Sequence, residues 1–316
     1  MRIVVLMSTY QGEHFVEEQI ASILSQLPAQ GRLMIRDDGS RDGTVKQIET
    51  INDPRVTLQR GENLGFVRSF LSLLTSVPAD AQMVMLSDQD DVWLPGKIER
   101  AWQAVASSGS VPTLYCSRLK LVDARLSPIG LSPHWPRPPS FENALTENIV
   151  TGCTSALNPA AVRLVTQYGD PTRIYFHDWW LYLVVAAFGR VIYDPQPTIL
   201  YRQHGYNAIG MGSGWGRYLT ILRFLRRQSW SHIMFNQIEN LRAVHGALLP
   251  VGHRRLIDEM FNARSALSML RLLLTPTRMR QSLLGDVLLR ATLLADVIGG
   301  RGLLPKSRRQ RAHRLG

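Results

Sequence analysis

Short apolar runs alternate with amphipathic stretches along the first 110 residues of the chain. Four apolar runs predict strands, at residues 3–7, 33–35, 56–58 and 83–86. Each run ends in a polar break, after which apolar residues recur at helical spacing, as from Phe15 to Leu27. Four strand-to-helix units in series indicate an α/β fold with a mainly parallel, doubly wound, Rossmann-like sheet and right-handed crossovers.

Polar segments follow three of these strands, at residues 8–11, 37–40 and 87–91. The carboxyl ends of parallel strands lie along one edge of a sheet, so we expect these segments to line one crevice. The third segment brings together three carboxylates, those of Asp88, Asp90 and Asp91. Carboxylates this close repel one another unless a cation lies between them, and oxygen ligands favour Mg²⁺ or Mn²⁺.

A polar turn with helix-capping aspartates is the alternative interpretation of this acidic segment. Pro95 fits the first turn of the helix that is expected to follow it. The chain contains no GxGxxG or GxxxxGK[ST] loop, which argues against a dinucleotide oxidoreductase and a P-loop phosphotransferase.

The middle of the chain predicts further strands at residues 113–116 and 198–201. Between them, residues 127–140 are rich in Pro, Trp and Ser and indicate an irregular loop. Gly152 precedes a helix expected from Pro159, and a glycine there allows the backbone to approach a sugar closely.

Asp178 stands at the start of an apolar helix expected over residues 179–188. A carboxylate in this position is stabilised by the helix dipole. An ordinary first-turn acid beside core tryptophans is therefore one interpretation of Asp178.

Long helical periodicity replaces the alternating pattern from residue 215 onward. The apolar repeats predict helices within residues 218–225, 233–249, 256–274 and 283–298. We therefore divide the chain into an α/β domain at 1–212, a basic helical region at 213–300 and a disordered basic tail at 301–316.

Charge is also distributed unevenly between the first two thirds of the chain and the last third. Residues 1–201 hold 17 Lys/Arg against 20 Asp/Glu, whereas residues 202–316 hold 19 against 5, so the net charge of +11 belongs to the last third. A basic surface of this kind can meet nucleic acid, anionic lipid or a phosphate-bearing substrate.

Composition and the distribution of apolar residues indicate a globular cytosolic protein. Hydrophobic residues make up 45% of the 316, and the two cysteines, Cys116 and Cys153, have neither disulfide-framework nor zinc-site spacing. The amino-terminal apolar run is too short for a secretion signal, and no segment reaches the length expected of a membrane span.

Four motifs resemble family 2 glycosyltransferases of the GT-A fold: MSTYQGEHFVEEQIASILSQ, IRDDGSRDGT, GENLGFVRSFLSLL and MLSDQDDVWLPGKI. The resemblance covers roughly residues 1–205, and the motifs in series are more specific than any one of them. FHDWW at 176–180 and YRQHGYN at 201–207 are most similar to the bacterial rhamnosyltransferase-like subgroup. The resemblance implies a nucleotide-binding half at 1–110 and an acceptor half at 111–212.

The resemblance also implies roles for individual residues. Those expected to bind the nucleotide sugar are Thr9, Tyr10, Glu13, Asp38, Arg68, Asp88 and Gln89. Mg²⁺ or Mn²⁺ would be held by Asp90 and His204. Asp178 would be the general base, and the residues facing the acceptor would be Gly152, His177 and Trp179.

The function expected from these residues is that of an inverting, metal-dependent glycosyltransferase. It would move a sugar, L-rhamnose from dTDP-L-rhamnose in the subgroup, to a hydroxyl of a bacterial surface polysaccharide or lipid-linked glycan. Work at the cytoplasmic face of the inner membrane would let the basic helices contact anionic lipid. The rivals are a nucleotidyltransferase that makes nucleotide sugars and a non-catalytic protein that binds membrane or nucleic acid through its basic helices.

Overall fold

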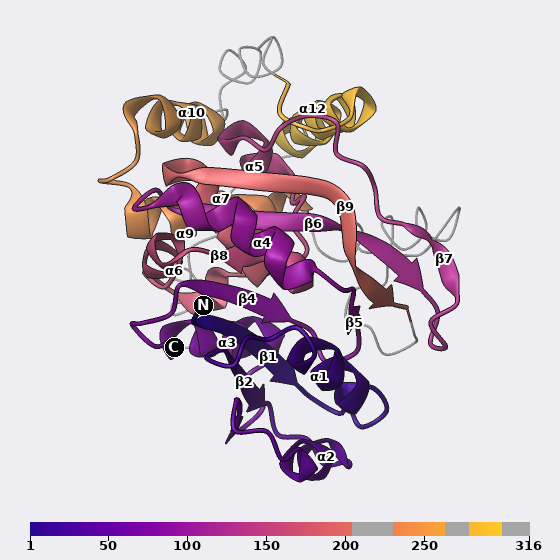
Figure 1. Cartoon of the computed structure of the whole chain (residues 1–316). Coiled ribbons are helices and arrows are strands. Elements are labelled where there is room, and N and C mark those ends of the chain that lie inside the picture. The colour runs from indigo at the N-terminus through magenta and orange to yellow at the C-terminus, as the bar shows by residue number, and fades with distance from the viewer. Residues whose placement is uncertain (204–229, 263–277, 299–316) are drawn as a thin grey trace, which may run out of the picture. The chain divides into compact units, whose positions relative to one another are not determined.

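The computed structural model describes residues 1–203, 230–262 and 278–298 (Figure 1). The chain forms two compact units. The first unit comprises residues 1–140, 148–167 and 176–211, and the second comprises residues 141–147, 168–175 and 212–316. The expectations for His204, for residues 218–225 and for the tail from residue 301 lie outside the described residues.

Four parallel strands form the amino-terminal half of the sheet in the first unit. They are β1 (Ile3–Thr9), β2 (Arg32–Asp37), β3 (Val56–Arg60) and β4 (Met83–Ser87), in the order β3-β2-β1-β4. Their registers place Thr9 beside Asp37 and Met7 beside Ser87, so the polar segments do emerge along one edge. This confirms the α/β fold class and the expectation that the polar segments share one edge of the sheet.

The other half of the sheet mixes strand directions. It contains β5 (Val92–Trp93), β6 (Thr113–Val122), β7 (Pro128–Leu131), β8 (Ala156–Leu157) and β9 (Arg190–Arg202). β8 joins β4 to β6 with antiparallel pairing on both sides, and β6 then pairs with β9 in parallel. The sheet is thus parallel in its first half and mixed in its second.

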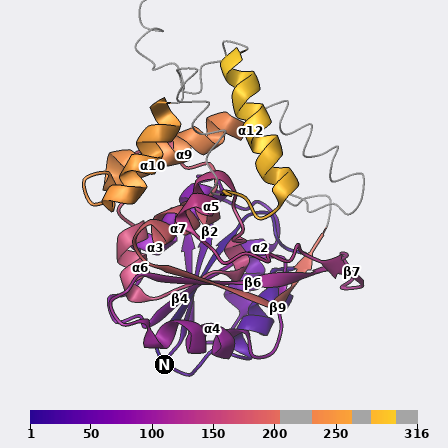
Figure 2. The same ribbon diagram turned by 90° about the horizontal axis from the view of Figure 1, so that it is seen from above.

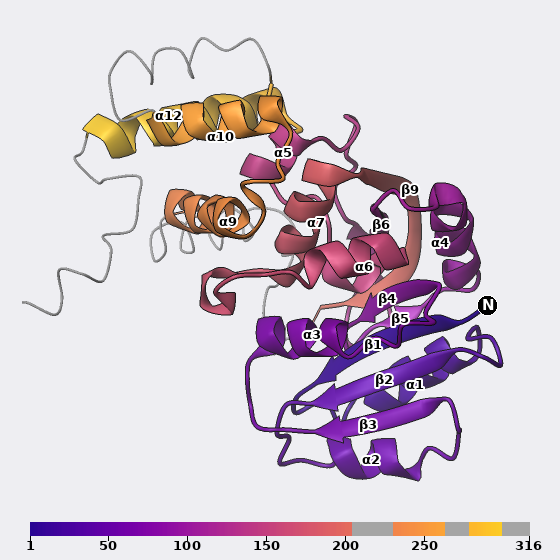
Figure 3. The same cartoon turned by 90° about the vertical axis from the view of Figure 1, so that its left-hand side faces the viewer.

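Helices cover both faces of the sheet in the first unit (Figure 3). α1 (Val16–Leu24), α2 (Thr44–Thr50) and α4 (Lys97–Val105) pack against the face that bears Ile3, Val5 and Met7. The opposite face is covered by α3 (Phe66–Thr75), α6 (Pro159–Val165) and α7 (His177–Phe188). Because both faces are covered, β1 and β4 are apolar without alternation.

Local chemistry shifts two of the expected elements. Pro95 does not enter the first turn of the next helix, since β5 intervenes and Gly96 takes a left-handed φ of 81° before α4 begins at Lys97. The irregular loop expected over residues 127–140 contains a short strand, β7, which pairs with β6. Asp178 lies in the first turn of α7, as predicted.

The described part of the second unit is helical. It contains α5 (Phe141–Thr146), α9 (Trp230–His245), α10 (Val251–Asn262) and α12 (Leu283–Ile298). The last of these matches its predicted range, and α9 and α10 overlap the ranges predicted from residues 233 and 256. None of the described helices is long and apolar enough to cross a membrane.

Candidate active site

The acidic segment after β4 is held mainly through its backbone. Gln19 on α1 donates from Nε2 to Ser87 Oγ at 2.6 Å and to the Asp88 carbonyl at 3.2 Å. Arg202 at the end of β9 donates from Nε to the Asp90 carbonyl at 2.8 Å. The backbone of this loop is therefore fixed from both sides, by α1 and by the end of β9.

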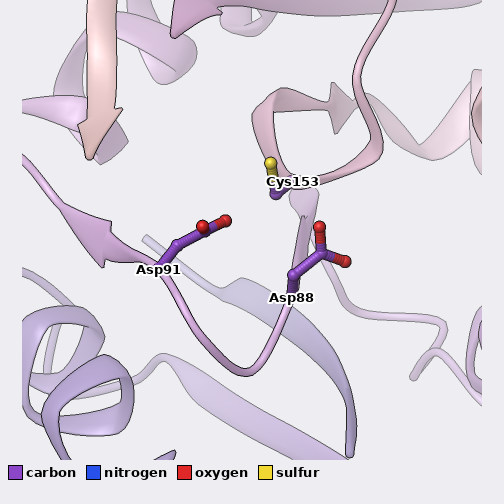
Figure 4. A group of neighbouring side chains, drawn as sticks. All are labelled: Asp88, Asp91 and Cys153. Atoms are coloured by element: carbon purple, nitrogen blue, oxygen red, sulfur yellow. The ribbon is translucent and has the colours of Figure 1, made fainter. Parts of the chain in front are cut away.

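Asp88, Asp91 and Cys153 form a compact group in the first unit (Figure 4). One ligand atom from each residue lies within 4.8 Å of the others. Asp91 is fully buried, and its Oδ1 accepts a hydrogen bond from the Arg202 backbone at 3.0 Å. No N–H or O–H of the described residues donates to Asp91 Oδ2, although this oxygen is buried.

This donor set fits a divalent cation. The Asp88 and Asp91 carboxylates supply the oxygen ligands that Mg²⁺ and Mn²⁺ prefer. Burial raises the pKa of the Cys153 thiol well above its usual value, so the thiol stays protonated and hydrogen-bonds to both carboxylates. Burial raises the pKa of Asp88 to about 7, and the neighbouring charges of Asp90 and Asp178 add to the effect. A cation bound here would relieve that repulsion, which supports the expectation of Mg²⁺ or Mn²⁺ at the acidic loop.

Asp178 faces the same group from the amino terminus of α7. Its Oδ1 accepts a hydrogen bond from the Trp179 backbone at 2.7 Å, and the Gly152 backbone and the Asn148 side chain also donate to the carboxylate. Burial raises the pKa of Asp178 to about 6. A carboxylate that is part-buried, oriented by three donors and basic for its type can remove a proton from a hydroxyl.

His177 lies directly before Asp178 and is buried. Its ring stacks on Phe70 with the centroids 4.3 Å apart and meets the edge of Phe66. Burial lowers its pKa to about 3, so the imidazole is neutral. Neither ring nitrogen has a hydrogen-bond partner among the described residues, and Nε2 lies only 2.5 Å from the position that a Cβ on Gly152 would take.

The loops after β1 and β2 are joined by side-chain contacts. Thr9 is buried and donates from Oγ1 to Asp37 Oδ1 at 3.0 Å. Glu13 accepts a hydrogen bond from the Gly43 backbone at 2.6 Å. Asp37 also caps the Gly39–Ser40 turn, so these polar residues fix the shape of the edge.

Asp38 fixes a third loop at this edge. The buried Arg36 pairs with its carboxylate, and the backbone N–H groups of Leu64 and Gly65 donate to it at 2.8 to 3.0 Å. Arg36 also donates to the Glu62 carbonyl at 3.0 Å. Asp38 therefore sets the path of the chain into α3.

Gln89 connects the acidic loop to the loop after β1. Its amide accepts from the Tyr10 N–H at 2.8 Å and donates to the Tyr10 carbonyl at 2.9 Å. The Tyr10 side chain remains exposed beside this pair.

The structure brings some of the predicted site residues together and leaves others apart. Asp88, Asp90, Gly152 and Asp178 come together by their contacts and mutual charges. Arg68 is exposed on α3, and Trp179 is buried in the core with 1% of its surface exposed. The roles given to all these residues remain predictions.

Sequence patterns alone did not point to four residues that support the site: Gln19, Lys97, Cys153 and Arg202. Lys97 is fully buried and donates from Nζ to the Cys153 carbonyl at 3.1 Å and to Thr198 Oγ1 at 3.3 Å. Burial lowers its pKa to about 8. Of these four residues, only Gln19 could have been noticed in the sequence, because it is a polar residue within the apolar stripe of α1.

A sheet with acids at the carboxyl edge of its parallel strands, faced by a helix-borne carboxylate, is the arrangement expected of the GT-A fold. The sequence matches the model of "Glycosyl transferase family 2" over residues 4–160. The chain is a glycosyltransferase of family 2, and this class excludes the nucleotidyltransferase and the non-catalytic binding protein.

Relatives agree with this family. The chain is 28% identical over 223 residues to the dTDP-rhamnosyl transferase RfbG of Shigella flexneri, covering 65% of this chain and 73% of that one. It is 27% identical over 95 residues to an Escherichia coli glucosyltransferase, WfgD, acting on GlcNAc-diphosphoundecaprenol, covering 30% of this chain and 37% of that one.

The fold is also found in a solved structure. The crystal structure of Staphylococcus aureus TarS residues 1–349 aligns with a TM-score of 0.57 at 14% identity, over 99% of this chain and 92% of that chain. The same TarS segment has been solved with UDP-GlcNAc. This likeness confirms the GT-A fold.

Proposed function

We propose that the protein is an inverting, metal-dependent glycosyltransferase that moves L-rhamnose from dTDP-L-rhamnose to a hydroxyl of a bacterial surface polysaccharide or lipid-linked glycan. The similarity to RfbG supports the donor, and the similarity to WfgD supports a glycan carried on a lipid diphosphate. The observation that carries the chemistry is the Asp178 carboxylate at the amino terminus of α7, oriented by the Trp179 and Gly152 N–H groups beside the acidic loop.

The donor would lie along the carboxyl edge of β1, β2 and β4. Thr9, Tyr10, Glu13 and Asp38 would surround the nucleobase end, with Arg68 and Gln89 beside the nucleotide and Asp88 toward the ribose or sugar. Asp38 would act partly through the loop it holds, because its carboxylate already accepts hydrogen bonds from Leu64 and Gly65.

Asp90 is the proposed principal ligand of Mg²⁺ or Mn²⁺, with Asp88 and Asp91 beside it and His204 as a further ligand. When bound, the cation would neutralise charge on the departing diphosphate. Arg202 and Gln19 hold the loop backbone so that these carboxylates keep their spacing.

Asp178 would remove the proton of the acceptor hydroxyl as that oxygen attacks the anomeric carbon of the donor. The new glycosidic bond forms as the bond to the diphosphate breaks, and one displacement inverts the configuration. Gly152 and His177 would face the acceptor on this side: the glycine lets His177 Nε2 approach its backbone, and the neutral His177 ring has nitrogens without partners among the described residues. Trp179 would act on the acceptor side indirectly, because its side chain is buried in the core and its backbone N–H orients Asp178.

A thermal-shift panel of dTDP, UDP and GDP, each with and without Mn²⁺, tests the proposal. We expect the largest manganese-dependent rise in melting temperature with dTDP, since binding stabilises the folded state by mass action. Asp90→Asn should abolish the manganese dependence, whereas Asp80→Asn, which alters a surface acid paired with Arg2, should leave it intact. A panel without any metal-dependent shift would contradict the metal assignment.

A further inference from the structure

The helix α12 lies in the second unit (Figure 2) and exposes several large apolar side chains between Leu283 and Leu294. Its large exposed side chains are Leu283 at 66%, Leu284 at 69%, Val287 at 55%, Leu288 at 55% and Leu294 at 37%. Leu284 and Leu288 are one helical turn apart, as are Leu283 and Val287, so the side chains form one stripe. We call these five residues the α12 stripe.

The contacts of the opposite face fix which way the helix points. The buried carboxylate of Asp286 accepts from the backbone N–H of Met279 at 2.8 Å and from Arg290 Nε at 2.9 Å. Leu289 and Leu293 are buried beside it. Within residues 283–294, the two charged side chains thus pair with each other away from the stripe.

The segment before α12 is anchored within the same unit. Asn143 on α5 donates from Nδ2 to the Met279 carbonyl at 3.0 Å, and the Gln281 N–H donates to Glu147 Oε2 at 2.7 Å. Rotation of α12 to bury the stripe would break these hydrogen bonds and pull Asp286 from its donors. The exposure of the stripe is therefore a property of the described part of the second unit.

Basic residues border the stripe in the sequence on both sides. Before the helix, Arg278 donates to the Arg280 and Gln281 carbonyls and Arg280 lies 3.9 Å from Glu147. The eighteen residues after Ile298 carry six Lys/Arg and no Asp or Glu. An apolar helix face bordered by cations is the pattern of helices that lie in the interface of an anionic bilayer. Pairing of two copies through α12 would instead bring two strongly basic segments together, which charge repulsion opposes.

We propose that the α12 stripe inserts into the interface of an anionic membrane and holds the enzyme at the lipid surface. This deepens the proposed function, since a glycan on a lipid diphosphate is presented at such a surface. The recognised partner is a bilayer with anionic headgroups, bound by apolar insertion and by attraction to the flanking cations. The proposed contact is insertion into the interface, and none of the described helices is long and apolar enough to span a bilayer.

The test is flotation of the full chain with vesicles, without donor or acceptor. Vesicles of phosphatidylcholine alone are compared with vesicles that also contain phosphatidylglycerol. We expect binding to the anionic vesicles that weakens at high salt, and a loss of at least about tenfold in Leu284→Glu/Leu288→Glu. A second variant, Leu284→Ser/Leu288→Ser, removes the apolar side chains without adding charge and should lose binding in the same direction.

The matched control is Ile129→Glu/Leu131→Glu, which alters two exposed apolar side chains on β7 of the first unit, at 45% and 48% exposure. This control should float like the wild type. Equal binding by wild type and both α12 variants, or no binding of the wild type to anionic vesicles, would overturn the proposal. Concentration-dependent self-association that the α12 variants abolish would also overturn it, by showing that a second copy covers the stripe.

Failure of this proposal can be told apart from failure of the proposed function. Manganese-dependent stabilisation by a nucleotide diphosphate is measured in solution and does not involve α12. If that stabilisation is observed but the enzyme does not bind anionic vesicles, only the membrane proposal fails. Vesicle binding without nucleotide binding would leave the α12 stripe assigned and remove the donor assignment.

Discussion

Arg202 Nε donates to the main-chain carbonyl of Asp90 over 2.8 Å, although the two residues are 112 positions apart. The same guanidinium donates to the Ala124 carbonyl at 2.7 Å, pairs with Glu18 and lies 4.7 Å from the centre of the Phe15 ring. One planar side chain thus connects α1, the acidic loop and the end of β9. We infer that Arg202 is a positioning residue for Asp90.

Replacement of Arg202 by lysine tests this role. Lysine keeps the charge but cannot reproduce the planar set of donors, so we expect manganese-dependent nucleotide affinity to fall about tenfold and stability to fall by roughly 2 kcal/mol. Thermal-shift titration with manganese measures both quantities. Arg100→Lys is the matched control, because Arg100 forms a two-pronged pair with Asp194 away from the acidic loop. Equal losses of nucleotide affinity in both variants would mean that Arg202 supports folding alone.

Asp178→Asn tests the general base. The amide keeps the size of the carboxylate but cannot take a proton, so the transfer rate should fall by about 10² to 10⁴ while nucleotide binding is kept. Asp123→Asn, an exposed acid that caps the turn after β6, is the control for a generic loss of charge. Transfer at the wild-type rate by a folded Asp178→Asn protein would assign the base to another residue.

The pH dependence follows from the burial of Asp178. Its pKa of about 6 lies above the ordinary value of 3.8, so the rate should rise as pH increases through about 6 and the carboxylate loses its proton. The folded state binds this proton more tightly than the unfolded state, so the stability contribution is present below pH 4 and lost as pH rises to 6. The negative charge of Asp178 also raises the pKa of Asp88.

Asp178→Asn should therefore be more stable than the wild type at pH 8, by roughly 1 to 3 kcal/mol, and closer to it at pH 4. Urea unfolding at the two pH values measures the difference. An unchanged difference between pH 4 and pH 8 would contradict the raised pKa of this carboxyl.

Gly152→Ala probes the packing between the base and His177. The added Cβ would lie 2.5 Å from His177 Nε2, and the stacked ring on Phe70 has little freedom to move. We expect a loss of about 1 to 3 kcal/mol and reduced transfer, because the Gly152 N–H also orients Asp178. Gly130→Ala is the matched control, since a Cβ there meets nothing within 4 Å. Differential scanning calorimetry and an activity assay should separate the two variants.

The sequence predicted the elements whose evidence is local. β1 to β4, the helices between them and the acidic loop all followed from apolar runs and polar breaks, and Asp178 was placed in the first turn of its helix. These features depend on neighbouring residues, so a pattern of ten or twenty positions contains them.

The supports of the site depend on distant partners and were not predicted. Arg202 meets Glu18 across 184 positions, and Lys97 meets the Cys153 carbonyl across 56. β5 and β8 are only two residues long, too short for a periodic signal, and the reversal of strand direction at β8 has no local signature. Burial of Trp179 and His177 likewise follows from the packing of α7 against the sheet and α3.

Asp38→Asn distinguishes a nucleobase contact from a purely local support. The substitution leaves Arg36 buried beside a neutral amide, whose N–H₂ cannot accept from Leu64 or Gly65, so we expect a loss of about 3 kcal/mol. Asp53→Asn, which breaks the more exposed pair with Arg55, should lose no more than about 1 kcal/mol. Nucleotide affinity is then measured at a temperature where both variants are folded. If Asp38 contacts the base, affinity for dTDP falls about tenfold or more while Asp53→Asn binds normally. Normal dTDP affinity in a folded but destabilised Asp38→Asn protein would restrict this carboxylate to holding the Glu62 to Gly65 loop.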